Sequence, residues 1–279
     1  MKQLFICLLI AVILSSCGSV PITGRKQLLL VSDAEMLSLS LTQYQTYMKS
    51  ATVSTDNTST AMVTRVGQNI ANAVEKYLKE NGYESEIANF AWSFALIKDN
   101  TANAFCMPGG KIVVFEGILP FTKTEAGLAT VVAHEVAHAV AKHSSEQVSQ
   151  QMGLSAGSQV VGIAASGQTE LAQTVIQSIY GLSSQGLVLL PYSRKMEYEA
   201  DHLGLIFMAM AGYNPEESII FWERMSSGTS SGSDILSTHP SDEKRIKELK
   251  GNMSEALKYY NGTKGTTAPA TSKGFKLVY

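Results

Sequence analysis

The stretch from residue 125 to residue 143 constrains the fold of this 279-residue chain more than any other. It is rich in alanine and apolar on almost every side of a helix, so a helix formed here has to be buried. Thr122 or Thr124 can cap such a helix, and acidic Glu125 falls in the first turn, where the helix dipole favours negative charge. We therefore expect a buried helix over these residues.

This helix carries the sequence His-Glu-Val-Ala-His at residues 134–138. Positions i and i+4 share a helical face, so His134 and His138 can reach one Zn²⁺ ion, while Glu135, one step round, can reach its water. The alternative is a chance pairing of histidines on a core helix, which average residue usage puts at about one in a hundred for a chain of this length. The pattern therefore predicts a peptidase-type metal site.

A catalytic zinc ion needs a third protein ligand and an open position for water. Residues 193–212 predict a second helix, on which Glu197, Asp201 and Gly204 share a small, acidic face. We assign Glu197 as the third ligand and Asp201 as the carboxylate that orients a zinc-bound histidine.

Solvent exposure is the alternative for the acidic residues of the second helix. They could pair with Arg194 and Lys195 on the surface, and this is what we expect for Glu199. His202 points away from the acidic face, so we expect it on the surface or in packing.

Together the two helices resemble a known family, the gluzincin zinc metalloproteases that include HtpX-like and CaaX-prenyl-protease-like enzymes. Within it the chain looks most like bacterial lipoprotein peptidases of the BepA and LoiP type and the related mitochondrial quality-control protease. Members carry a His-Glu-x-x-His helix followed by a Glu-x-x-x-Asp helix, which residues 134–138 and 197–201 match. Three weaker motifs extend the resemblance from about residue 21 to residue 249: residues 103–119, Thr238-His239-Pro240 with Arg245, and residues 21–28. Cys106-Met107 departs from the family pattern without touching a ligand.

The resemblance implies an α+β, predominantly helical zincin-type fold with a small sheet whose edge strand lies by the active site. It implies one Zn²⁺ ion and a membrane-anchored endopeptidase for unfolded or misassembled envelope proteins, active in protein quality control. Outer-membrane assembly machinery is a further candidate partner. Two alternatives remain open: a zinc-bound chaperone or assembly lipoprotein with silent peptidase activity, and a lipoprotein scaffold with a structural metal.

The N-terminus predicts export and lipid attachment. A short positive region precedes an apolar stretch at residues 4–14, too short to span a bilayer, and Leu-Ser-Ser-Cys at residues 14–17 resembles a lipoprotein cleavage site. We expect Cys17 to be the acylated first residue of the mature protein, the alternative being a cleaved signal without lipid. Resemblance to enteric lipoproteins favours the outer membrane, facing the periplasm.

Composition limits the other possibilities. With 22 basic and 24 acidic residues, the chain lacks the positive charge that nucleic-acid binding needs. Cys106 is the one cysteine left after Cys7 and Cys17 are accounted for, so an intramolecular disulfide and a thiolate metal site are excluded. A zinc ion therefore has to rest on histidine and carboxylate ligands.

Periodicity and turn signals predict the remaining elements. We expect helices at residues 32–49, 63–78, 215–226 and 241–259, strands at 90–96 and 111–115, a loop at 51–60, and a short terminal strand at 275–279. The predicted segments are a signal peptide (1–16), a lipidated linker (17–31), a metallopeptidase domain (32–260) and a flexible tail (261–279).

Two regions are harder to interpret. Residues 147–193 carry one charge, Glu170, and by family likeness we expect a mobile lid or membrane-adjacent surface there, the alternative being an ordinary helical hairpin. His239 could block the open zinc position, stabilise the tetrahedral oxyanion, or cap a turn before Pro240. In the predicted mechanism Glu135 takes a proton from water and passes it to the leaving amine, and a substrate segment adds to a sheet edge near residues 111–115.

Overall fold

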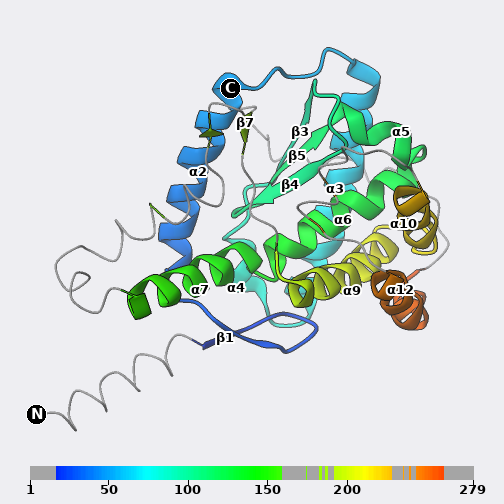
Figure 1. Ribbon diagram of the computed structural model, residues 1–279. Helices are drawn as coiled ribbons and strands as arrows, with labels where there is room; N and C mark the ends of the chain where they lie inside the picture. The colour runs from blue at the N-terminus through cyan, green and yellow to red at the C-terminus, as the bar shows by residue number, and fades with distance from the viewer. Residues whose placement is uncertain are drawn as a thin grey trace, which may run out of the picture.

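The computed structural model describes residues 17–158, 192–227 and 243–260, with residues 174, 182–183, 186–187, 235 and 239. Within them the fold is mostly helical with small sheets, so the predicted α+β class is confirmed (Figure 1). The predicted signal peptide, the C-terminal tail with its terminal strand, and most of the predicted lid lie outside the described residues. No helix in the described part of the chain has the length and apolarity needed to cross a bilayer.

Two central helices, α6 (Glu125–Val140) and α9 (Arg194–Met210), pack against each other in the middle of the molecule (Figure 1). Their backbones approach closely at Gly204, where an added Cβ atom would lie 3.2 Å from the backbone nitrogen of His134. α3 (Asn57–Glu80) packs against both helices, and most side chains of α6 are buried. The all-apolar helix is therefore the centre of the core, as its composition predicts.

The ends of α6 follow from local chemistry. Of the two predicted caps, Thr124 is the one used, because its Oγ1 accepts a hydrogen bond from Gly127 N at 3.0 Å. The helix ends at Val140, earlier than predicted, because Lys142 adopts a left-handed conformation with φ 53°. A separate helix, α7 (His143–Ser158), begins directly after it.

The main sheet has three strands in the order β3-β5-β4. β5 (Lys111–Phe115) lies in the centre, parallel to β3 (Ser93–Ile97) and antiparallel to β4 (Ala104–Met107). The prediction that residues 111–115 offer an open edge is therefore wrong, since both edges of β5 are paired. The strand packed beside α6 is β4.

The other helices agree with prediction to within a few residues, apart from α3. It begins at Asn57, inside the predicted loop, because the Asp56 carboxylate caps it by accepting hydrogen bonds from Thr58 N and Ser59 N, both at 3.0 Å. The remaining elements are α2 (Asp33–Ser50), α4 (Glu84–Ile87), η1 (Glu116–Ile118), α5 (Leu119–Thr122), β6 (Leu182–Ser183), β7 (Gly186–Leu187), α10 (Glu217–Ser227) and α12 (Glu243–Ala256).

Residues 17–31, predicted to be a linker, contain an antiparallel β-hairpin formed by β1 (Cys17–Ser19) and β2 (Lys26–Leu28). In Figure 1 this dark blue hairpin lies beneath α7 and α9. Its turn places Ile22 at φ 70°, in the left-handed region that a β-branched residue rarely occupies. The N-terminal segment is thus part of the folded domain.

Candidate metal centre

Four buried side chains meet between α6, α9 and the C-terminal part of the chain. His134, His138, Glu197 and His239 each offer one ligand atom, and these atoms all lie within 4.8 Å of one another. His134 Nε2 lies 3.0 Å from His138 Nε2 and 3.2 Å from His239 Nδ1, and His239 Nδ1 lies 3.0 Å from Glu197 Oε1. Ligands about 2.1 Å from a tetrahedral Zn²⁺ are about 3.4 Å apart, so the four groups fit this ion.

Glu135 provides a second sign that the cluster is built around a bound species. Both carboxylate oxygens are buried and have no hydrogen-bond partner among the described residues. His239 Nε2 lies 3.4 Å from Glu135 Oε1, beyond good hydrogen-bond geometry. Because a buried carboxylate without hydrogen bonds is costly, its oxygens fit a role toward a water molecule or substrate.

His134 lies against the carboxylate of Asp201, the residue that we assign from the sequence to orient a zinc-bound histidine. His134 Nδ1 lies 3.0 Å from Asp201 Oδ1, so an Nδ1–H donor leaves Nε2 free to face the cluster. Asp201 is held in turn by Arg245, which donates from Nε at 2.5 Å and from a terminal nitrogen at 2.8 Å.

Arg245 also belongs to the site, although the sequence indicated it only as part of a weak motif and predicted no role for it. Its side chain is fully buried, lies 3.6 Å from the ring centre of Trp222, and places a terminal nitrogen 3.2 Å from Glu197 Oε2. It therefore balances the charges of Asp201 and Glu197. Nothing in the charged pattern of residues 241–250 distinguishes Arg245 from its solvent-facing neighbours.

The electrostatics divide the cluster into charged and neutral members. Although burial opposes it, His239 and the two helix histidines hold the pKa of Glu197 well below its ordinary value. Burial also opposes protonation of His134, but Asp201 and Glu197 raise its pKa to about 9. Burial holds the pKa of His138 well below its ordinary value and raises that of Glu135. A metal ion that binds here therefore competes with a proton on His134.

The predicted surface position of Glu199 is wrong. Its side chain is 8% exposed, and it contacts His143, Thr23 and Arg25. His143, which sequence reasoning left without a role, places its Nδ1 2.8 Å from His138 Nδ1. His202 lies away from the centre, with its Nε2 2.9 Å from a Glu255 carboxylate oxygen on α12.

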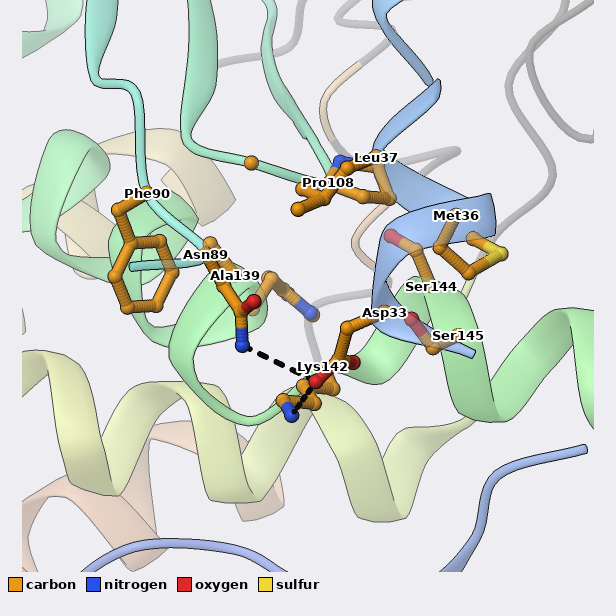
Figure 2. A pocket seen from close by; sticks show the side chains of 12 residues that line it. Asp33, Met36, Leu37, Asn89, Phe90, Pro108, Ala139, Lys142, Ser144 and Ser145 are labelled. Atoms are coloured by element: carbon orange, nitrogen blue, oxygen red, sulfur yellow. Dashed lines mark hydrogen bonds and ion pairs between the residues drawn. The ribbon is translucent and has the colours of Figure 1, made fainter. Parts of the chain in front are cut away.

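A small pocket of about 30 Å³ lies beside His138. Figure 2 shows its wall of residues from α2, from the segment around Asn89 and from the corner between α6 and α7. Lys142 lies at this corner, and its Nζ pairs with Asp33 at 2.7 Å and with Glu86 at 2.8 Å. The ligand His138 thus adjoins a partly apolar space with a charged border.

Comparison with known proteins agrees with a metallopeptidase site. The model of peptidase family M48 matches residues 64–253, a range that contains all four cluster residues. The mitochondrial metalloendopeptidase OMA1 of Schizosaccharomyces pombe is 42% identical over 186 residues, covering 66% of this chain and 53% of that protein. The OMA1 protein of Arabidopsis thaliana is 39% identical over 189 residues, covering 67% of this chain and 37% of that protein.

Bacterial relatives are also found. A putative beta-barrel assembly-enhancing protease of Vibrio cholerae is 32% identical over 165 residues, covering 56% of this chain and 33% of that protein. Identity to the two OMA1 proteins above is therefore higher than identity to this bacterial protein, whereas the sequence motifs suggested a stronger likeness to bacterial lipoprotein peptidases. The chain spans about half or less of the length of these relatives.

Proposed function

Because this chain belongs to peptidase family M48, we propose that it is a membrane-anchored zinc metalloendopeptidase that hydrolyses unfolded or misassembled envelope proteins. One observation carries the hydrolytic part of the proposal: the buried carboxylate of Glu135 has no hydrogen-bond partner in the described part of the chain and lies beside four ligand groups. A site that only held a metal would have no need of such a carboxylate.

The chain's own residues divide the work of peptide hydrolysis. Zn²⁺ bound at this site supplies Lewis acidity, which polarises a carbonyl group and makes water more acidic. His134, His138 and Glu197 would hold the ion. Glu135 accepts the proton of the attacking water and delivers it to the leaving amine, and its raised pKa brings it closer to the range in which a general base both accepts and donates.

His239 adds a fourth candidate ligand to the three assigned from the sequence. Its Nδ1 lies among the ligand atoms, which agrees with the predicted blocking role better than with a turn cap. In His239→Ala, higher peptidase activity would indicate a block, lower activity an oxyanion stabiliser, and unchanged activity a structural residue.

The decisive experiment compares wild type with Glu135→Gln on casein or an unfolded envelope protein, with and without chelator. We expect Glu135→Gln to keep its zinc content and melting temperature but to lose activity at least about 100-fold, because general base catalysis contributes at this scale. Hydrolysis by Glu135→Gln at the wild-type rate would refute the proposed mechanism.

The membrane anchor and the envelope substrates rest on the N-terminal pattern and on the likeness to beta-barrel assembly-enhancing proteases. Lipid attachment at Cys17 predicts that Cys17→Ser, expressed in a bacterium, is released from the membrane fraction. Mass spectrometry of the mature N-terminus provides the direct measurement. Membrane retention of an unacylated Cys17→Ser protein would contradict this anchor.

A second candidate is a zinc-bound assembly factor or scaffold without turnover. The four protein ligand groups favour it, because structural zinc sites leave no open position. The two candidates differ in one outcome: envelope assembly rescued by Glu135→Gln supports the assembly factor, whereas loss of rescue supports the peptidase.

A further inference from the structure

A continuous line of hydrogen-bonding side chains connects the N-terminal hairpin to the metal centre. We call this line the hairpin relay, and its members in order are Thr23 and Arg25, then Glu199, then His143. It ends at His138, one of the candidate ligands. The first two members lie about 175 positions from Glu199 in the sequence, so folding alone brings them together.

The relay begins with two donors on one carboxylate. Thr23 Oγ1 donates to Glu199 Oε1 at 2.5 Å, and Arg25 Nε donates to Glu199 Oε2 at 2.5 Å. Arg25 also binds both oxygens of Glu146 on α7, at 3.0 and 2.7 Å, so its planar group is held on two sides. Both donors belong to the turn between β1 and β2, and the side chain of Arg25 is 14% exposed.

The charge of Glu199 fixes the direction of the next hydrogen bond. An ionised carboxylate only accepts, so His143 Nε2, 3.1 Å from Glu199 Oε2, has to be the donor. His143 is fully buried, which favours the neutral ring. A neutral imidazole that carries its hydrogen on Nε2 has a lone pair on Nδ1.

The last hydrogen bond sets the form of the ligand itself. His138 Nδ1 lies 2.8 Å from His143 Nδ1 and therefore has to donate to it. The hydrogen on Nδ1 leaves His138 Nε2 with a free lone pair, and this is the atom that faces His134 Nε2 at 3.0 Å inside the cluster. Tyr192 stacks on the same ring, with ring centres 4.1 Å apart, and keeps its plane in place.

We propose that the turn of the N-terminal hairpin positions His138 for metal binding through the hairpin relay. Thr23 and Arg25 are positioning residues that do not touch the metal. Without their two donors, Glu199 is held less firmly, and His138 gains access to the other ring form, whose Nε2–H points at the remaining ligands. The inference rests on the proposed zinc site and adds a source of control in the hairpin of residues 17–28.

The test compares three full-length variants. Thr23→Val with Arg25→Met removes both donors, Arg25→Lys keeps a charged donor, and Arg65→Met is the matched control. Arg65 also pairs with a glutamate, Glu125 at the start of α6, but it is 44% exposed, and no histidine among the described residues pairs with either member. The measurements are zinc affinity by chelator competition and the ring form of His138 by ¹⁵N NMR of the metal-free proteins.

We expect the double variant to bind zinc about 10- to 100-fold more weakly, which is the usual effect of losing a partner that orients a metal ligand. Arg25→Lys should recover part of the loss, and Arg65→Met should stay within about twofold, as expected for an exposed ion pair. NMR should show hydrogen on His138 Nδ1 in the wild type and a mixture of ring forms in the double variant.

Two results would overturn the inference: wild-type zinc affinity in a folded double variant, or hydrogen on His138 Nε2 in the wild type. If the double variant does not fold, Thr23→Val alone decides, with binding weakened about threefold for the loss of one hydrogen bond and unchanged binding counting against the relay. A wild-type protein that binds no zinc would refute the proposed function itself, whereas a normal wild type with insensitive variants refutes the relay alone.

Discussion

The two histidines of α6 lie one helical turn apart and face the same cluster, yet they are supported by different networks. His134 is held directly by Asp201, which is fixed by the fully buried Arg245 of α12. His138 is held by a neutral imidazole, and the charged groups of the hairpin relay lie further away. The first network comes from the C-terminal side of the domain and the second from its N-terminal side.

The difference extends to the protonation of the two histidines. Asp201 and Glu197 together raise the pKa of His134 to about 9, whereas burial outweighs the contact of His138 with Glu197 and keeps the pKa of His138 well below its ordinary value. Both arrangements present Nε2 to the cluster once a metal ion is bound. The C-terminal network therefore contributes mainly charge, and the N-terminal network mainly orientation.

Removal of Arg245 should have the largest effect, because it leaves Asp201 and Glu197 buried without their cation. We expect Arg245→Met to lower the free energy of unfolding by about 3–5 kcal/mol, measured by urea denaturation. Lys250→Met on the same helix is the control, since its pair with Glu223 is exposed and should contribute less than about 1 kcal/mol. If the two variants are equally stable, Arg245 does not balance buried charge, and the proposed charge contribution of the C-terminal network is wrong.

Asp201→Asn tests the charge contribution with little change in volume. Zinc affinity should fall about 10- to 100-fold, because the amide is a weaker acceptor for His134 Nδ1–H. Chelator competition measures the affinity, and circular dichroism checks the fold. An affinity equal to that of wild type would mean that His134 needs no carboxylate partner.

The relay should make a smaller contribution that depends on pH. Burial opposes ionisation of Glu199, but hydrogen bonds from His143, Thr23 and Arg25 lower its pKa from 4.5 to about 2. A lowered folded-state pKa contributes stability above the unfolded value, and this stability is lost as the pH falls through 4.5 toward 2. Between pH 7 and pH 3, metal-free wild type should lose about 2 kcal/mol more than Glu199→Gln in urea denaturation. Parallel stability curves for the two proteins would contradict the assignment.

The sequence predicted the residues whose relation is local. His134, His138 and Glu135 lie on one helix, and Glu197 and Asp201 on another, so helical spacing alone was enough to place them on common faces. The expectation for Glu199 failed for a related reason. Glu199 lies two positions from Glu197 and therefore on nearly the opposite side of α9. That side is covered by the β1–β2 hairpin, in a segment that the sequence pattern predicts to be a linker.

The order of strands also lay beyond local patterns. Residues 111–115 were recognised as a strand, but β4 was not, and its pairing with β5 decides which strand lies at the edge. Arg245 likewise sits among charged neighbours in the sequence and is buried because α12 packs on α9. Contacts between distant segments therefore account for most of what the sequence left undetermined.

The left-handed residue Lys142 has a consequence for transplanting this centre into another scaffold. Residues five apart on an unbroken helix point in different directions, yet the rings of His138 and His143 lie with their centres 4.9 Å apart. The corner at Lys142 changes the direction of the chain between α6 and α7, so one short peptide provides both a candidate ligand and the neighbour that orients it. A graft that copied only α6 and ended at Val140 would include His134 and His138 but not His143, the residue that orients His138.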